Sequence, residues 1–402
     1  MLAIKSTKTF LLCLSIVSCS LLLSSCHAFR LFAWGPPDDK DLRHFHTSTV
    51  NPSDSVFYFI KAERDINLPD SVMLNGSGLS TDDFIEKSKT TAFIIIRNDT
   101  VIFEQYYENY TSASIVPMFS ITKTFIGALV GIACKEGLIE SVHDPIGKYL
   151  PDLKDTSLHS VTIQHLLNMR SGIRFSNDYW NPFGRFSQLH FGNNFSKYVI
   201  DRSRSRYSPG ERYTYNQLDV QLLGEIISRS TGKTVTQYTQ EKIWKPLGMQ
   251  YPAYWNLDSK KHGMENCGSG LSLNPIDLAK LARLYLKNGT WNGTKLLDQS
   301  WVDSSVKIDS ATRDFYVTYL WKHTLIKPDS SQNPATKDSH ENADDSPFNN
   351  LIRVNDYFSV GMGSQRILYV YPEKNLIIIK LSKGYRYQNT KQILHELSKE
   401  IG

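Results

Sequence analysis

A serine and a lysine three residues apart precede a long apolar stretch. The segment Pro117-Met118-Phe119-Ser120-Ile121-Thr122-Lys123 leads into an apolar run from Thr124 to Cys134. A run that is apolar nearly all round predicts a helix inside the protein, and Gly137 is a suitable stop for it. Ser120 then lies at the helix N-terminus, and Lys123 lies one turn later on the same face. Burial lowers the pKa of a lysine, so Lys123 could act as a base for a serine nucleophile.

The Ser-x-x-Lys spacing is weak evidence when it is taken alone. It also occurs at Ser230–Lys233 and Ser304–Lys307, in polar surroundings that are typical of a solvated surface. At Ser120 the structural alternative is a helix N-cap followed by a lysine whose charged end reaches solvent. The spacing alone leaves both interpretations open.

The composition indicates a globular protein. The chain has 402 residues, 41% of them hydrophobic and 21% charged, enough for one large domain or two smaller ones. The net charge of +5 is small, and no run of Lys and Arg alternates with aromatic residues, so we expect no nucleic-acid partner. His44 and His46 lack further ligands at suitable spacing, so we expect no metal site there. The sequence leaves open whether Cys134 and Cys267 form a disulfide.

The first 26 residues have the pattern of a signal peptide. Two lysines precede an apolar stretch, Phe10 to Leu23, that is short for a membrane span. The following Leu23-Ser24-Ser25-Cys26 resembles the lipobox of bacterial lipoproteins. This resemblance predicts lipidation of Cys26 and a location in the bacterial cell envelope, periplasmic or surface-facing, with the membrane as a partner. The alternatives are the looser match ending at Cys19, an uncleaved anchor and an ordinary signal peptide.

Strand patterns lie near both ends of the chain, and helical patterns lie between them. Because the strands must pair to bury their faces, we predict an α/β (α+β) fold with an antiparallel sheet made from both chain ends and flanked by helices. A mainly helical subdomain is inserted at about 138–260, and the cleft between the two parts is the expected site. Residues 27–79 are predicted to be a tether that packs partly on the body, and 80–402 a single domain. The predicted strands are 91–96, 101–107, 316–325, 366–371 and 376–381.

Residues 173–197 combine seven large aromatic side chains with loop-forming residues. We predict a long loop here, which either lines a binding site or forms a packed surface lobe.

Over residues 80–400 the chain resembles the penicillin-binding-protein-like serine hydrolases, that is, the serine β-lactamase family in its class C and esterase-like branch. The resemblance implies a β-lactamase-like fold. Three motifs carry it, in the order that the family has them. They are Ser120-x-x-Lys123, the segment from Pro209 to Gly224 that contains Tyr215-Asn216-Gln217, and Gly361-Met362-Gly363-Ser364-Gln365 before a strand.

The resemblance also implies the chemistry. Ser120 attacks a carbonyl group and forms an acyl-enzyme, while Lys123 and Tyr215 move protons. The backbone N–H groups of Ser120 and Gln365 are expected to stabilise the oxyanion. No metal or cofactor is required.

Departures from the family motifs bear on the substrate. Gln217 replaces an Asn, Met362 stands where a Lys or His is usual, and Ser364 replaces a glycine. The substrate-binding residues implied by alignment are Gln217, Gly361, Met362, Gly363 and Ser364. Without the cation at 362, a substrate carboxylate loses a charge-assisted hydrogen bond of about 1.5–3 kcal/mol, unless Arg366 replaces it.

We therefore expect an esterase or amidase that acts on a small acyl or peptide-like compound, similar to the 6-aminohexanoate-dimer hydrolase and esterase branch. One alternative is a cell-wall DD-peptidase or β-lactamase, which the exported location favours and Met362 disfavours. The other alternative is a catalytically silent binding lipoprotein, which the joint presence of Ser120, Lys123 and Tyr215 disfavours.

Overall fold

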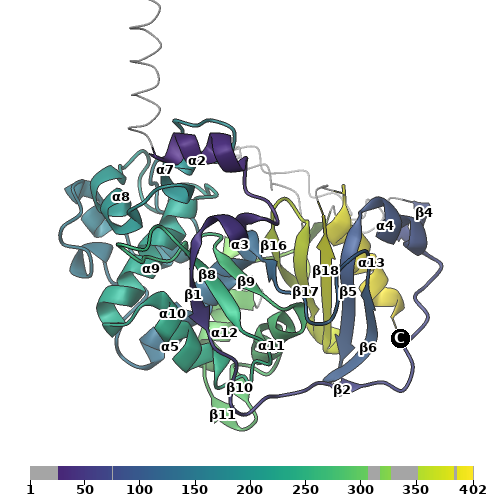
Figure 1. The fold of residues 1–402 in the computed structure, drawn as a ribbon. Helices are drawn as coiled ribbons and strands as arrows, with labels where there is room; N and C mark the ends of the chain where they lie inside the picture. The colour runs from purple at the N-terminus through teal and green to yellow at the C-terminus, as the bar shows by residue number, and fades with distance from the viewer. Residues whose placement is uncertain (1–25, 75, 307–316, 327–351, 384–386, 402) are drawn as a thin grey trace, which may run out of the picture.

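The computed structural model describes residues 26–74, 76–306, 317–326, 352–383 and 387–401. An eight-stranded sheet forms one half of the molecule, and helices around a smaller sheet form the other half (Figure 1). The large sheet has the order β12 (Val317–Thr318), β13 (Trp321–Lys322), β16 (Tyr357–Gly361), β17 (Arg366–Tyr371), β18 (Leu376–Ser382), β5 (Thr90–Arg97), β6 (Thr100–Tyr106) and β2 (Ile60–Lys61).

Strands from the two chain ends pair at the centre of this sheet, as predicted. β18 is antiparallel to β5, with Ile378 opposite Ile95 and Ile379 opposite Ile94. The strand predicted at 316–325 is broken, in its described part, into the short strands β12 and β13. The four other predicted strands all form, within one residue of their expected ends. Their runs of branched apolar residues have both faces covered, which explains why the pattern is continuous rather than alternating.

The two faces of the sheet belong to separate cores. The face with Ile94 and Ile379 packs toward the helical half, where α11 (Pro275–Leu286) contacts β17 and β18. The opposite face, with Ile95 and Ile378, is covered by α13 (Thr390–Glu400). α4 (Thr81–Lys87) and the hairpin β3 (Ser71–Leu74) and β4 (Ser77–Ser80) lie beside α13 (Figure 1).

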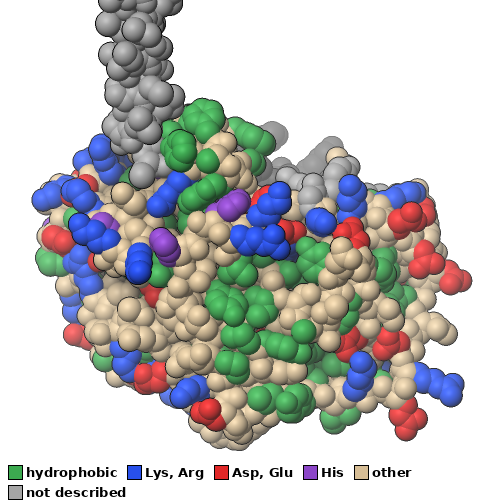
Figure 2. Space-filling model, viewed as in Figure 1, with side chains coloured by type: hydrophobic (Ala, Val, Ile, Leu, Met, Phe, Trp, Pro, Cys, Tyr) green, Lys and Arg blue, Asp and Glu red, His purple; other side chains and the backbone are tan. Residues whose placement is uncertain are grey.

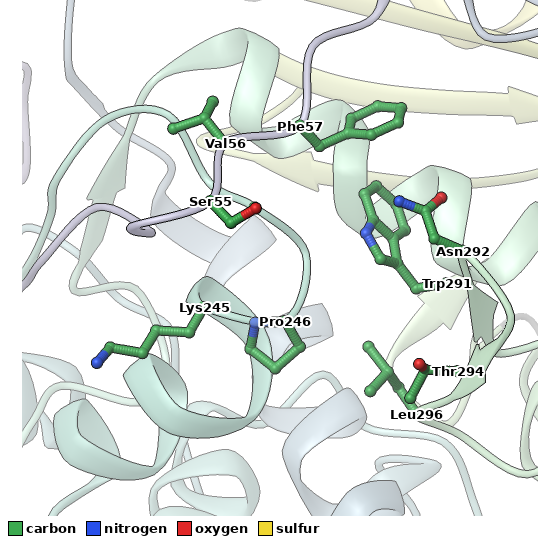
Figure 3. Close-up of a pocket in the computed structure, with 10 residues that line it drawn as sticks. Ser55, Val56, Phe57, Lys245, Pro246, Trp291, Asn292, Thr294 and Leu296 are labelled. Atoms are coloured by element: carbon green, nitrogen blue, oxygen red, sulfur yellow. The ribbon is translucent and has the colours of Figure 1, made fainter.

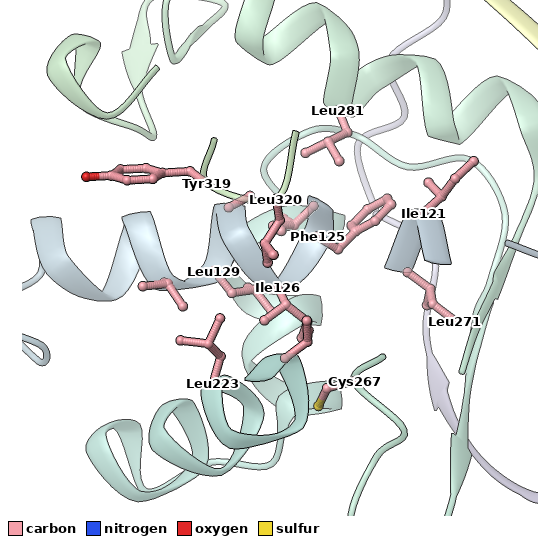
Figure 4. Close-up of a cluster of buried hydrophobic side chains, with 14 of the residues drawn as sticks. Ile121, Phe125, Ile126, Leu129, Leu223, Cys267, Leu271, Leu281, Tyr319 and Leu320 are labelled. Atoms are coloured by element: carbon pink, nitrogen blue, oxygen red, sulfur yellow. The ribbon is translucent and has the colours of Figure 1, made fainter. Parts of the chain in front are cut away.

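The helical half is built around α5 (Thr122–Lys135), whose side chains are buried from Thr122 to Ala133. Leu223 of α9 (Gln217–Thr231), Leu281 of α11 and Leu320 surround the helix (Figure 4). Because contacts come from several sides, the helix must be apolar nearly all round, as its sequence is.

The remaining elements complete the helical half. The smaller sheet has the order β1 (His46–Val50), β8 (Ala253–Leu257), β9 (Leu271–Leu273) and β7 (Val116–Pro117). The other helices include α6 (Ile163–Leu167), α7 (Arg185–His190), α8 (Phe195–Arg202), α10 (Val235–Thr239) and α12 (Gln299–Val306), the last of which contacts β12 and β13 of the large sheet. Short helical turns are η1 (Phe119–Ile121), η2 (Ile146–Lys148), η3 (Thr156–Ser160), η4 (Gln240–Trp244) and η5 (Pro372–Lys374), and short strands are β10 (Thr290–Trp291), β11 (Thr294–Lys295), β14 (Leu325–Ile326) and β15 (Ile352–Arg353).

The expected tether at 27–79 packs along the body over much of its length. It contributes β1 to the smaller sheet and β2 to the larger one, after α2 (Cys26–Trp34) and α3 (Asp41–His44). Residues 1–25 of the predicted signal peptide lie outside the described residues.

The prediction of one long loop at 173–197 is wrong. α7 and the start of α8 form within it, because Phe186, Leu189 and Phe195 pack into the core. The thiols of Cys134 and Cys267 are both free.

Candidate active site

Ser120 lies at the junction of the two halves, in the short turn η1 between β7 and α5. It is half-buried, while its neighbours Phe119 and Ile121 are buried. Phe119 has a φ of +48°, a left-handed conformation that costs an ordinary residue about 1–3 kcal/mol. The fold therefore holds the turn in a strained shape that leaves the Ser120 side chain accessible.

Lys123 lies in the first turn of α5, and its side chain is only 3% exposed. Its Nζ is 3.0 Å from Ser120 Oγ and 3.4 Å from Gln217 Oε1, and it donates to the carbonyl oxygen of Gly268. Burial lowers the pKa of Lys123 to about 7, because desolvation disfavours the ammonium form.

The partners of Lys123 suit a neutral amine. The oxygens of Gly268 and Gln217 can only accept hydrogen bonds, so each takes one N–H. A neutral amine has two N–H groups and one lone pair. With both N–H groups engaged, the lone pair remains for the Ser120 hydroxyl, which is the arrangement that a general base requires.

Tyr215 approaches Ser120 from the helical half, immediately before α9. Its hydroxyl donates to Ser120 Oγ at 2.7 Å, and its ring centroid is 5.1 Å from Lys123 Nζ. The next residue, Asn216, caps α9 by accepting from the Leu218 N–H, which fixes the chain direction at this point. Desolvation raises the pKa of Tyr215 to about 12, so its phenol stays protonated near neutral pH and can donate.

Gln217 is buried at the start of α9 and contacts Lys123. Its Oε1 accepts from Lys123, and its Nε2 donates to Ser269 Oγ at 3.1 Å. The longer side chain that replaces the expected Asn thus reaches Lys123, and its predicted contact with substrate stays a prediction.

The third motif brings backbone, rather than a side chain, against the serine turn. β16 packs on η1, and a Cβ added at Gly361 would lie 2.2 Å from the carbonyl oxygen of Met118. Met362, Gly363 and Ser364 then have positive φ angles in succession, which turns the chain sharply into β17.

This turn geometry does not support Gln365 as an oxyanion donor. Its N–H donates to the Met362 carbonyl at 3.3 Å, and its own carbonyl accepts from the Ser382 N–H at 2.7 Å. Both backbone groups of Gln365 are therefore engaged within the sheet and its turn.

Gly361→Ala tests the contact with the serine turn. The clash between the added methyl group and a backbone oxygen cannot be relieved by a rotamer change, so we expect a loss of about 1–3 kcal/mol of stability. We also expect a fall in kcat/KM of about 100-fold or more, because β16 must move away from Ser120. Chemical denaturation and ester turnover measure the two effects. Gly78→Ala is the matched control in β4, where the nearest atom would be 4.0 Å away, and equal behaviour of the two variants would contradict the assigned contact.

Arg366 does not replace the missing cation. Its guanidinium is buried and binds the carbonyl oxygens of Pro117 and Ser382 and the carboxylate of Asp39. Arg366 therefore ties the N-terminal segment to the sheet. Its guanidinium has these partners instead of a place where it could bind a substrate carboxylate.

Two nearby residues were missed by the sequence reasoning. Gly268 accepts from Lys123, and a Cβ at this position would meet the Gln217 side chain at 2.5 Å. Lys322, at the end of β13, places its Nζ 4.9 Å from the Tyr215 ring centroid. A glycine pair at 268 and 270 was visible in the sequence, but nothing in it indicated proximity to Lys123.

A pocket of about 310 Å³ lies elsewhere on the surface (Figure 3). Its walls include Phe57, Lys245, Trp291 and Leu296, and its lining contains none of Ser120, Lys123 and Tyr215. Among the described residues, no cluster of three or more His, Cys, Asp or Glu side chains is arranged to hold a metal ion.

Known proteins resemble this chain in sequence and in fold. A sequence model of the β-lactamase family matches residues 82–392. The 6-aminohexanoate-dimer hydrolase of Paenarthrobacter ureafaciens is 25% identical over 235 residues, which are 55% of this chain and 58% of that protein. A D-aminopeptidase of Gluconobacter oxydans is 28% identical over 35% of this chain and 26% of its own length. The chain thus spans well under two thirds of either of these relatives.

Two solved structures show the same fold. A putative 6-aminohexanoate-dimer hydrolase from Bacillus anthracis superimposes with a TM-score of 0.70 and 20% identity, covering 90% of this chain and 91% of that one. A class C β-lactamase mutant gives a TM-score of 0.55 and 14% identity, over 80% and 95% of the two chains. The family match includes Ser120, Lys123 and Tyr215, and the chain belongs to the β-lactamase family as a serine hydrolase.

Proposed function

We propose that the protein hydrolyses an ester or amide bond of a small acyl compound through an acyl-enzyme on Ser120. One observation carries this proposal: Ser120 Oγ lies 3.0 Å from an amine and 2.7 Å from a phenol, with the other hydrogen bonds of that amine already used. The serine hydroxyl thus has a base on one side and an acid on the other.

The first half-reaction uses both groups. Lys123 accepts the Ser120 proton as Oγ attacks the carbonyl carbon, and the carbonyl oxygen becomes an oxyanion. We assign the oxyanion donors as the N–H groups of Ser120 and Met362, because Met362 follows the residue that packs on the serine turn. Collapse expels the leaving group, which takes a proton from Tyr215, and the proton on Lys123 restores the phenol.

In the second half-reaction a water molecule attacks the acyl-enzyme and gives its proton to Lys123. The ester bond to Ser120 breaks, Oγ regains a proton and the acid leaves.

The substrate class is supported by the relatives. Their names specify a 6-aminohexanoate dimer and D-amino-acid peptides, which are small amides. Met362 in the third motif favours such compounds over β-lactams, for which the family uses a cation at that position.

The proposal predicts a trapped intermediate. The full chain mixed with p-nitrophenyl butyrate should release a burst of p-nitrophenol, and intact-protein mass spectrometry should find one butyryl group, located on the peptide with Ser120. A labelled penicillin and nitrocefin serve as comparison substrates. Steady turnover of nitrocefin far above ester turnover would favour the β-lactamase alternative, and a folded protein with no adduct from any of these compounds would contradict the acyl-enzyme.

We also propose that a lipid on Cys26 holds the protein at the bacterial envelope. No helix within the described ranges combines the length and apolar character needed to cross a membrane. α2 begins at Cys26, the last residue of the lipobox-like sequence, and exposes Phe29 and Phe32. Apolar side chains gather over this helix at the top of Figure 2.

The anchor proposal predicts that Cys26→Ser moves the protein from the membrane fraction to the soluble fraction of expressing cells. Mass spectrometry of the membrane-extracted wild type should show acyl groups on Cys26. Cys134→Ser is the control for loss of a thiol. An unmodified Cys26 in the wild type would contradict the proposal.

A further inference from the structure

We propose that His190 and Asp41 are positioning residues for Lys123, and that they act through a buried chain of hydrogen bonds that ends on Gln217. The inference rests on the proposed function, in which Lys123 is the base. His190 ends α7, and Asp41 lies in α3, so the N-terminal segment contributes to the active site from behind.

The acceptors of Lys123 depend on one turn of the chain, residues 266–270. The carbonyl oxygen of Gly268 accepts from Lys123 Nζ, and Ser269 Oγ accepts from Gln217 Nε2 at 3.1 Å. This second contact leaves Gln217 Oε1 to face Lys123 Nζ, 3.4 Å away. Both oxygens that receive the N–H groups of the amine are therefore placed by this turn.

Asn266 fixes the direction of the hydrogen bonds in the turn. Its Oδ1 accepts from the backbone N–H of Ser269 at 3.1 Å, and a backbone N–H can only donate. The Nδ2 of the same amide therefore faces His190 Nδ1, at 3.3 Å. Because Nδ2 is a donor, Nδ1 must accept, and the imidazole is the neutral tautomer with its proton on Nε2.

The Asp41 carboxylate holds His190 in this tautomer. Its Oδ2 lies 3.5 Å from Nε2, and a carboxylate can only accept, so the ring keeps its proton on this side and offers Nδ1 to the turn. The hydroxyl hydrogen of Ser269 then has two acceptors, His190 Nδ1 at 3.4 Å and Asn266 Oδ1 at 3.3 Å. Ser269 Oγ is thereby left to accept from Gln217.

The surroundings of His190 show why its nitrogens matter. The side chain is only 1% exposed and lies among the rings of Phe45, Phe186 and Phe191, and Asp41 is also buried. A phenylalanine would satisfy the packing of this aromatic pocket. The imidazole adds one acceptor and one donor, and burial makes a satisfied polar network rigid.

The test compares His190→Phe and Asp41→Asn with the wild type, in the full-length chain with p-nitrophenyl butyrate as substrate. His190→Phe keeps a ring in the aromatic pocket and removes Nδ1. Asp41→Asn keeps the shape of the side chain. Its Oδ1 should still accept from the Asp38 N–H, as the carboxylate does, so Nδ2 presents a donor to Nε2 and drives the imidazole proton to Nδ1.

We expect each variant to lower kcat/KM by about tenfold, mainly through kcat, because Lys123 loses a fixed acceptor. The pH midpoint at which kcat/KM rises should also move to lower pH, since an ammonium form with fewer oxygen acceptors gives up its proton more easily. In a Gln217→Met background, either variant should change kcat/KM by less than about twofold further, because the chain acts through Gln217.

Phe191→Leu is the matched control, because it disturbs the same aromatic pocket and leaves both nitrogens of His190 in place. It should lower the stability to urea but keep kcat and the pH midpoint. If His190→Phe fails to fold, Asp41→Asn decides by the same measurements.

An unshifted midpoint in the folded variants overturns the inference. An equal loss with and without Gln217→Met also overturns it, since a purely structural role does not depend on that side chain. If the wild type shows no turnover that depends on Ser120, the proposed function and this inference both fail. Ser120-dependent turnover with an unshifted midpoint removes only the role of His190 and Asp41.

Discussion

Ser120→Ala should lower kcat/KM for p-nitrophenyl butyrate by about 10⁴-fold or more. The variant loses the only atom that lies within hydrogen-bonding distance of both Lys123 and Tyr215 in the described site. Without Oγ no acyl-enzyme can form, and the burst of p-nitrophenol should disappear together with steady turnover. The fold should remain, because Ser120 is half-buried and a methyl group is smaller than the hydroxymethyl group.

Ser230→Ala is the matched control for this variant. Ser230 begins another Ser-x-x-Lys sequence, but it lies at the end of α9, where Lys233 pairs with Glu241 rather than with the serine. Its turnover should equal that of the wild type. Comparable losses in the two variants would mean that the effect arises from general destabilisation, and full activity of Ser120→Ala would remove Ser120 from the mechanism.

The comparison of these two serines shows what the sequence could predict about the site. The spacing is identical, so the distinction came from the apolar run after Lys123, which predicted a buried helix and hence a lysine with a lowered pKa. Tyr215 was predicted from the motif around it, and the structure places its hydroxyl on Ser120.

The residues that the sequence could not predict are those brought in by tertiary contacts. Gly268 is 145 positions from Lys123, and a backbone carbonyl leaves no signal in the residue type. The turn after Gly361 could not be predicted, because three successive residues adopt positive φ, of which only Gly363 is a glycine. An alignment by residue type therefore assigned the oxyanion role to Gln365, whose N–H closes the turn.

The fold was predicted well where apolar patterns decide it. The strands at 90–97 and 376–382 are runs of branched residues that need cover on both faces, so pairing between the chain ends followed from burial alone. In contrast, α7 is only six residues long, and Gly184 at its N-cap provides no side chain that could cap the helix. The aromatic residues in and around α7 are compatible with a loop as well as with a helix. Short helices of this kind are stabilised by packing rather than by local propensity.

Lys123→Met should lower kcat/KM by about 10³-fold, within the range for loss of a general acid–base group. Methionine keeps the length and apolar stem of the lysine but cannot accept the Ser120 proton. In the wild type, Lys123 must be neutral to act, and burial lowers its pKa to about 7. The wild-type kcat/KM should therefore rise with pH, about tenfold per unit below pH 7, and level off above it, whereas the residual activity of the variant should lack this limb.

The same lowered pKa predicts a pH dependence of stability. In the unfolded chain Lys123 titrates near 10.4, so between about pH 7 and 10.4 the unfolded state binds more protons than the folded state. The free energy of unfolding of the wild type should thus rise with pH across this window relative to that of Lys123→Met. The hydrogen bonds that the variant loses change its stability by an amount that does not depend on pH, so they do not alter this difference in slope. Urea denaturation at pH 7.5, 8.5 and 9.5 measures the difference in slope. Lys233→Met, which removes a half-exposed lysine paired with Glu241, should follow the wild type in both activity and slope. Two outcomes would contradict the assignment of Lys123 as the base. One is an equal pH slope of stability in the wild type and Lys123→Met, and the other is a pH-dependent rise in activity that persists in Lys123→Met. Either would show that a different group titrates.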